Sequence, residues 1–273
     1  MVPQVAEALT RLSREMAANP GGVFDPVGKF GWDAFVKFAN LHVLDPKRVP
    51  RYSGYVHVSA ATYSPGWDCD RVLWFQANTY PVGATAYEGI MRTWMMGTAL
   101  QVFVYQWIGY ALERYFPHVE WIDIGFEKAA FTPGTEEAKF LRGSADIWLK
   151  YKPEGDSIKT AVVDLKSTSE GQQAKRSSKK AISPAEPEYI RQLCTYSGGL
   201  GADIGILLFW VKVSPHPFIQ VDVSPKPLLL PTILHRVKQV FESPTPVVPR
   251  ISRYCTKCPY QEQCRRIQEG EPC

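Results

Sequence analysis

The chain has 273 residues, of which 45% are hydrophobic, and this is enough apolar material for one substantial core with extensions. Its net charge of +4 and pI near 8.6 are compatible with nucleic-acid binding but do not by themselves indicate it. No apolar run approaches a membrane span and no leader-like apolar core opens the sequence, which argues against membrane and secreted disulfide-rich proteins and predicts a cytoplasmic location.

The first part of the chain is expected to be mainly helical. Residues 1–50 read as a helical N-terminal extension, with apolar residues at helical spacing from Val5 to Leu12 and a second helix around Trp32 to Phe38. Residues 51–82 contain many aromatic side chains and are expected to be loop-rich. One long apolar helix, or two shorter ones, should follow over residues 84–116.

The second part of the chain alternates strands with helices. A helix over 187–200 should cross between the third and fourth strands, and Pro225 and Pro227 open a further helix that runs to about Phe241. The expected strands cover residues 119–131, 143–151, 159–167, 203–213 and 217–223. The pattern predicts an α/β fold with a mixed central β-sheet flanked by helices.

Two carboxylates and a lysine are predicted to meet on neighbouring strands. Asp164 and Lys166 are one residue apart, so their side chains project to the same face of a strand. Asp146 closes a Gly-x-x-Asp segment just before the preceding strand, and a hairpin through residues 152–159 would hold it beside Asp164. Such a group suits Mg²⁺ or Mn²⁺ and an anionic substrate, although a solvated ion pair is the simpler alternative.

Polar side chains also mark the segment that follows. Gln192 and Tyr196 are four residues apart and so share one face of the helix, where they could bind a phosphate or a metal-bound water. The simpler alternative places Tyr196 in the core and Gln192 at the surface. Lys175 and Arg176 begin the basic run KRSSKK between the third strand and this helix. That run reads as an exposed loop that could attract a phosphate backbone or be merely solvated.

Three of the six cysteines are closely spaced as Cys255-x2-Cys258-x5-Cys264. In a reducing compartment this spacing favours ligation of a metal or cluster over disulfides. A fourth ligand is needed, and the candidates are Cys69, Cys194 and Cys273, of which Cys273 would complete a local zinc site.

In this order, Gly143-x-x-Asp146, Asp164-x-Lys166 and Gln192-x3-Tyr196 resemble the RecB-type branch of the PD-(D/E)XK nuclease superfamily, which has a restriction-endonuclease-like core. The cysteines resemble its iron–sulfur subgroup, which includes CRISPR-associated cluster-containing exonucleases and the AddB nuclease domain. The resemblance covers about residues 63–266. After the helical extension over 1–50, it implies a nuclease domain over 51–273, whose cluster region comprises Cys69 and residues 255–264.

The resemblance implies a metal-dependent DNA nuclease, expected to be an exonuclease on single-stranded or frayed DNA ends. Asp146, Asp164 and Lys166 would be catalytic, and the two carboxylates would bind Mg²⁺ or Mn²⁺ with the backbone carbonyl of Leu165. Gln101 stands where such nucleases place a metal-binding histidine. This departure leaves open a second function, a nuclease-fold DNA-binding subunit with impaired catalysis.

The remaining roles also follow from the resemblance. Gln192 and Tyr196, helped by Lys175 and Arg176, would hold the DNA strand near the scissile phosphate. A [4Fe–4S] cluster would be held by the four cysteines Cys69, Cys255, Cys258 and Cys264. Single-stranded DNA is the expected partner, protein partners could come from replication, recombination or CRISPR adaptation, and no membrane association is expected; DNA repair and recombination are the expected processes.

Overall fold

The structure, a computed structural model, describes residues 2–18, 55–63, 66–78, 101, 104–105, 107–168, 187–211, 218–249 and 255–270. The predicted helix around Trp32 to Phe38, the basic residues Lys175 and Arg176, and Cys273 lie outside the described residues. The chain forms two compact units, each of which is assembled from three segments. The first comprises Met1–Val49, Met96–Ala130 and Ser144–Lys226, and the second comprises Pro50–Met95, Phe131–Gly143 and Pro227–Cys273.

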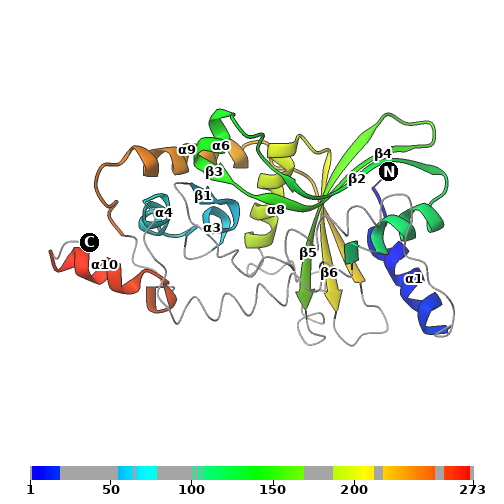
Figure 1. The fold of residues 1–273 in the computed structure, drawn as a ribbon, viewed down its shortest axis with the longest axis horizontal. Coiled ribbons are helices and arrows are strands. Elements are labelled where there is room, and N and C mark those ends of the chain that lie inside the picture. Colours follow the sequence, from blue (N-terminus) through cyan, green and yellow to red (C-terminus); the bar gives the residue numbers. More distant parts are fainter. Residues whose placement is uncertain are drawn as a thin grey trace. The chain divides into compact units, whose positions relative to one another are not determined.

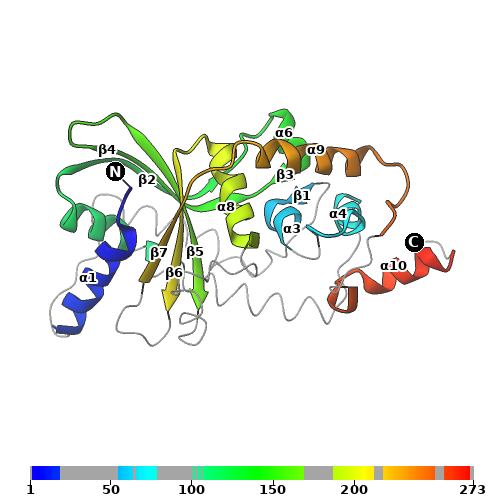
Figure 2. The same cartoon turned by 180° about the vertical axis from the view of Figure 1, so that it is seen from behind.

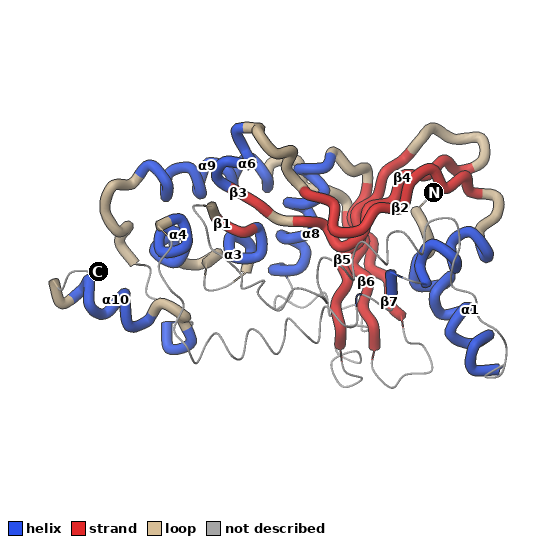
Figure 3. The backbone as a smooth tube through the Cα atoms, viewed as in Figure 1, coloured by secondary structure: helices blue, strands red, loops and turns tan. Residues whose placement is uncertain are grey.

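The first unit is built on a five-stranded mixed sheet of order β2-β4-β5-β6-β7 (Figures 1 and 3). Only the β5–β6 pair is parallel, and the other neighbouring pairs are antiparallel. The strands are β2 (Val119–Ala129), β4 (Ser144–Pro153), β5 (Lys159–Thr168), β6 (Ile204–Val211) and β7 (Phe218–Val223). The prediction of a mixed α/β sheet is therefore confirmed, with strand ends within about two residues of those expected.

Helices cover this sheet because its strands carry apolar side chains on both faces. Val163, Ile206 and Leu208 join one core with Leu9 and Leu12 of α1 (Val5–Ala18). The same core includes residues from a helical stretch that is described at 101, 104–105 and 107–115. Figure 2 shows α1 beside β7, where Gln220 Nε2 donates to the backbone oxygen of Pro3 over 2.7 Å.

Helix α8 (Pro187–Leu200) connects the parallel strands β5 and β6 and packs against both. Its predicted bounds are confirmed, and the glycine that ends it does so for a backbone reason. Gly201 has a φ of +62°, while Ala202 N donates to Ser197 O over 2.8 Å, which closes the last turn. The helix therefore ends at a fixed place above the start of β6.

The second unit is mainly helical. It contains α3 (Val58–Thr62), α4 (Asp70–Ala77), α6 (Glu136–Phe140), α9 (Leu229–Glu242), the 3₁₀ turn η1 (Cys255–Lys257), α10 (Gln261–Gln268) and the short parallel pair β1 (Val56–His57) and β3 (Leu141–Arg142). The expectation of a loop-rich segment at 51–82 was wrong for α3 and α4. Residues 71–76 of α4 are all buried, so their run of apolar residues lacks the one-sided spacing of a surface helix.

Packing within the second unit fixes α4 against α9 and the C-terminal segment. Phe75 stacks on Tyr260 with ring centroids 5.1 Å apart, and Trp74 Nε1 donates to the backbone oxygen of Ser243 over 3.2 Å. Before α4, a Cβ atom on Gly66 would lie 2.0 Å from the backbone oxygen of Ala60, so only glycine fits there. No helix among the described residues is both long enough and apolar enough to cross a bilayer.

Candidate active site

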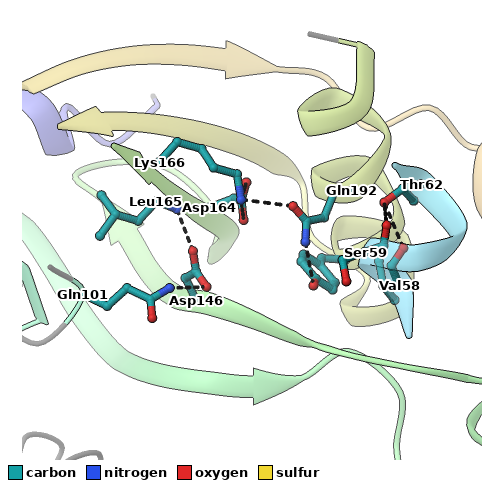
Figure 4. Close-up of polar contacts among 10 residues, drawn as sticks. Val58, Ser59, Thr62, Gln101, Asp146, Asp164, Leu165, Lys166 and Gln192 are labelled. Carbon is teal, nitrogen blue, oxygen red and sulfur yellow. Dashed lines mark hydrogen bonds and ion pairs between the residues drawn. The ribbon is translucent and has the colours of Figure 1, made fainter. Parts of the chain in front are cut away.

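The candidate site lies in the first unit, where the ladder between β4 and β5 opens. The two strands pair from Tyr151–Lys159 to Ile147–Val163, and Asp146 and Asp164 are the next residues beyond the last pair. There Leu165 N donates to Asp146 Oδ2 over 2.7 Å (Figure 4). The carboxylate thus accepts a backbone hydrogen bond just beyond the end of the ladder, and the opening holds two acidic side chains.

Asp164 and Lys166 project from β5 to the same side, as their spacing predicts. Lys166 Nζ donates to Asp164 Oδ1 over 2.9 Å and lies 2.8 Å from Asp164 Oδ2. Only 1% of Asp164 is exposed, and its Oδ2 atom accepts no hydrogen bond of good geometry despite this ion pair. The structure therefore brings together the three predicted residues and leaves one buried carboxylate oxygen with unused acceptor capacity.

The charges of this group strongly influence one another. Burial, and then the neighbouring Asp164 carboxylate, raise the pKa of Asp146 to about 8. Burial also raises the pKa of Asp164, against the opposing effect of Lys166. For Lys166, burial alone would lower the pKa, but Asp164 and Asp146 together raise it above its ordinary value. The lysine is thus held as a cation, whereas its single positive charge does not compensate two ionised carboxylates.

The uncompensated negative charge of Asp146 and Asp164 suits the binding of a divalent cation. Two adjacent carboxylates provide hard oxygen ligands, and the unsatisfied Asp164 Oδ2 is a suitable donor atom. No group of three or more His, Cys, Asp or Glu side chains in the described part of the chain forms a ready metal site. A cation held by Asp146 and Asp164 would therefore need further ligands from backbone, amide or water oxygens, which is usual for Mg²⁺.

Helix α8 supplies the other neighbours of Lys166. Lys166 Nζ donates to Gln192 Oε1 over 3.0 Å (Figure 4). Gln192 Nε2 in turn donates to the Tyr196 hydroxyl over 3.1 Å. The Lys166 ammonium also lies 5.3 Å from the centre of the Tyr189 ring. Gln192 and Tyr196 are only 7% and 3% exposed, so their shared helix face points into the protein, where Gln192 orients the lysine. Contact with DNA remains a prediction for both residues.

A single glycine places α8 close enough for these contacts. A Cβ atom on Gly205 of β6 would lie 2.7 Å from Leu193 Cγ, the residue next to Gln192. Any larger side chain would push the helix away from the sheet. The glycine inside the apolar run IGILLFWV is a sequence signal for such a close approach, although its role was not foreseen.

Gln101 contacts the site as the sequence suggests, but as a donor. Its Nε2 atom donates to Asp146 Oδ1 over 3.0 Å, so its amide oxygen is not the atom directed at the carboxylates. Metal ligation by Gln101 remains a prediction that requires its amide to turn. The same holds for the Leu165 carbonyl, since the contact that the structure shows is made by the Leu165 amide nitrogen.

A third acidic residue near the site was not foreseen. Between the pairs Phe126–Ile147 and Lys128–Ala145 of β2 and β4, Glu127 lies at the position opposite Asp146. Its φ of 50° is in the left-handed region, which non-glycine residues seldom adopt, and its charge contributes to the raised pKa of Asp146. Nothing in the spacing of the sequence indicates this backbone conformation.

The second unit gathers four cysteines. Cys69 is the residue before α4, Cys255 begins η1, Cys258 follows that turn and Cys264 lies in α10. Burial, and then the thiols of Cys69, Cys264 and Cys255, raise the pKa of Cys258 to about 11. All four are free thiols, so no disulfide competes with ligation, and Cys69 is the predicted fourth member that the structure places near the trio.

The fifth described cysteine is separate from this group. Cys194 is 1% exposed in α8 of the first unit, and its Sγ atom lies 3.9 Å from the backbone oxygen of Ser224. Burial raises the pKa of its thiol, as expected of an unreactive core cysteine.

Known proteins provide an independent comparison. A sequence model described as the PD-(D/E)XK nuclease superfamily matches residues 67–265. A search of curated proteins finds no match. Among solved structures, SSO0001 is similar at 16% identity and a TM-score of 0.47, over 85% of this chain and 94% of its own.

A second similar structure is an alkaline exonuclease (LHK-Exo) from Laribacter hongkongensis. It has 15% identity and a TM-score of 0.38, over 68% of this chain and 86% of its own. Its complex with dAMP has 14% identity and a TM-score of 0.41, over 80% and 95%. Structural similarity at this level carries no information on activity. The superfamily match, however, spans well over half of the chain and contains the carboxylates, the lysine and the four gathered cysteines, so this protein belongs to the PD-(D/E)XK nuclease superfamily.

Proposed function

We propose that the protein is a metal-dependent DNA nuclease, acting as an exonuclease on single-stranded or frayed ends. The observation that carries this proposal is the group of Asp146, Asp164 and Lys166 at the opening of the β4–β5 ladder. Two acidic side chains whose pKa values are raised by burial are costly in an isolated protein and become favourable beside a cation. Membership of the nuclease superfamily supports phosphodiester hydrolysis as the reaction.

Asp146 and Asp164 would hold Mg²⁺ or Mn²⁺, with the Leu165 carbonyl and Gln101 as further candidate ligands. When bound, the cation supplies Lewis-acid activation of the phosphodiester and lowers the pKa of the attacking water. Lys166 remains protonated and presents its ammonium group beside Asp164, where it can stabilise negative charge on the phosphoryl oxygens. Gln192 and Tyr189 keep that ammonium in place from α8.

The strand would be guided to this site by the basic residues Lys175 and Arg176, which lie between β5 and α8 in the sequence. Such contacts give affinity without sequence preference, as an exonuclease requires.

The test is degradation of single-stranded DNA labelled at either end by protein purified without oxygen, with Mg²⁺ or Mn²⁺ and with a chelator as the control. Release of short products from one labelled end, in the presence of metal alone, supports the proposal. Blunt duplex and frayed duplex substrates then compare the preference for free ends. Cleavage that persists in chelator, or at the same rate after Asp164→Ala, would contradict it.

We further propose that Cys69, Cys255, Cys258 and Cys264 hold a [4Fe–4S] cluster. The gathering of four free thiols in one unit supports this, since thiolates are the ligands of such clusters. Among the described residues these thiols do not form a finished metal site. Anaerobically purified protein should be brown with about four irons per chain. A colourless protein with one zinc that depends on Cys273 would favour a local zinc site.

One observation favours a second function. Gln101 donates its amide to Asp146 and so occupies a carboxylate that the cation needs. A DNA-binding subunit with impaired catalysis is consistent with that contact. Protein that binds single-stranded DNA but cleaves none with either metal would support this alternative.

A further inference from the structure

Arg71 is a buried cation beside the cysteine site. It lies two positions after Cys69, in the first turn of α4, and only 6% of the residue is exposed. Its Nε atom donates to the backbone oxygen of Val247 over 2.7 Å, and its Nη1 atom donates to Cys264 Sγ over 3.5 Å. The guanidinium thus links α4 to the segment that follows α9 and to α10.

In the part of the chain that the structure describes, this buried charge has no acidic partner. Among the residues that the structure describes, no Asp or Glu forms an ion pair with Arg71, and the adjacent Asp70 pairs with Arg236. A buried guanidinium is costly unless a negative group compensates it, and a carbonyl and a neutral thiol do so only weakly. Among the described groups that Arg71 contacts, only the Cys264 thiol can become negatively charged, so the cysteine site is the source of counter-charge that the structure offers.

A metal-bound thiolate supplies that counter-charge. An iron–sulfur cluster with four cysteine ligands has a net negative charge, and its sulfur atoms accept hydrogen bonds that adjust its reduction potential. We propose that Arg71 is a positioning residue of the iron–sulfur site, which holds Cys264 in place for ligation and compensates the negative charge of the loaded site. This inference rests on the cluster proposed above and adds the residue that retains it and sets its potential.

Two measurable consequences follow. A fixed positive charge near the cluster stabilises the reduced form, which is the more negative one, so Arg71 raises the reduction potential. The Val247 link also fixes the guanidinium against the C-terminal segment, so Cys264 is held while the cluster is bound. Partners of this kind outside the ligand set typically change metal affinity by about tenfold to a hundredfold.

The experiment compares full-length, anaerobically purified wild-type protein with Arg71→Gln and Arg71→Lys. The measurements are iron per chain, the rate of iron loss to a chelator and the reduction potential from an optical redox titration. We expect Arg71→Gln to lose iron about ten times faster or more and to have a lower potential. Arg71→Lys keeps the charge but not the planar fork, so it should restore much of the potential while iron loss stays fast.

Arg236→Gln is the matched control. Arg236 also bonds two groups of the same unit, Asp70 and the backbone oxygen of Gly66, and it makes no hydrogen bond to any cysteine that the structure describes. This control should lower the melting temperature without changing the reduction potential. If the wild-type protein holds the cluster and Arg71→Gln has the same reduction potential and rate of iron loss, the proposed role of Arg71 is wrong, while the cluster itself stands. Wild-type protein that binds no iron would overturn the cluster itself and this inference with it.

Discussion

The Lys166 ammonium is shared between Asp164 of its own strand and Gln192 of α8, at 2.9 Å and 3.0 Å. Without Gln192, the lysine would keep its charge partner but lose the contact that directs it. We therefore expect Gln192→Ala to lower kcat by about tenfold to a hundredfold with little change in KM. Gln220→Ala on β7, which removes the hydrogen bond to the backbone oxygen of Pro3, should lower stability but not kcat. Equal effects of the two variants on kcat would contradict the positioning role.

Replacement of the buried Asp164 is the most direct test of the proposed metal-dependent cleavage. Asp164→Ala should reduce cleavage by more than about a hundredfold, because the cation loses a ligand and Lys166 loses its partner. Binding of single-stranded DNA, followed by fluorescence anisotropy in chelator, should be largely retained. The exposed Asp222 of β7 offers a control, since Asp222→Asn should leave the rate near that of the wild type. A variant at Asp164 that remains active would remove the central claim.

The pH dependence of stability should reveal the strained carboxylate pair. A carboxyl whose pKa is raised by folding binds its proton more tightly in the folded state. The free energy of unfolding of metal-free protein should therefore fall as pH rises from about 4 to about 8. Added Mg²⁺ should restore it, with a larger rise in melting temperature at pH 8 than at pH 6. Asp146→Asn should flatten both trends, and an unchanged slope in that variant would assign the effect elsewhere.

The close approach of α8 to β6 predicts a specific sensitivity to one methyl group. Gly205→Ala should lower stability by about 1–3 kcal/mol and reduce activity, because Leu193 and hence Gln192 must move. Gly125→Ala on β2 is the matched control, since its Cβ atom would meet its nearest neighbour at an ordinary 3.7 Å. Urea unfolding and kcat measured for both variants separate the two cases. A harmless Gly205→Ala would show that the helix can shift freely.

Replacement of Gln101 tests whether the first unit is a full nuclease or an impaired one. Gln101→His would replace an amide donor by an imidazole that can ligate a metal, so it should raise the rate or shift the preference towards Mn²⁺. The measurement is the cleavage rate across a range of Mg²⁺ and Mn²⁺ concentrations. A lower rate in this variant would indicate that the hydrogen bond to Asp146 is itself needed.

Local patterns in the sequence were sufficient to predict much of the candidate site. The two-residue period of a strand places Asp164 and Lys166 on one side, and the prolines and glycines around α8 define its ends. Contacts between residues that are distant in the sequence could not be predicted from such local patterns. The hydrogen bond from Gln101 to Asp146 joins residues 45 positions apart, and the left-handed backbone of Glu127 leaves no trace in the spacing. The inward orientation of Gln192 depends on Gly205, which is outside its helix.

The second unit has a consequence for the order of events during synthesis. Its segments come from three separate parts of the chain, and the residues between them belong to the first unit. Cys69 is translated 195 residues before Cys264. Arg71 and Phe75 of α4 therefore lack their C-terminal partners, Cys264 and Tyr260, until that segment has been made. Loading of the proposed cluster can only follow translation of all five strands of the first unit's sheet.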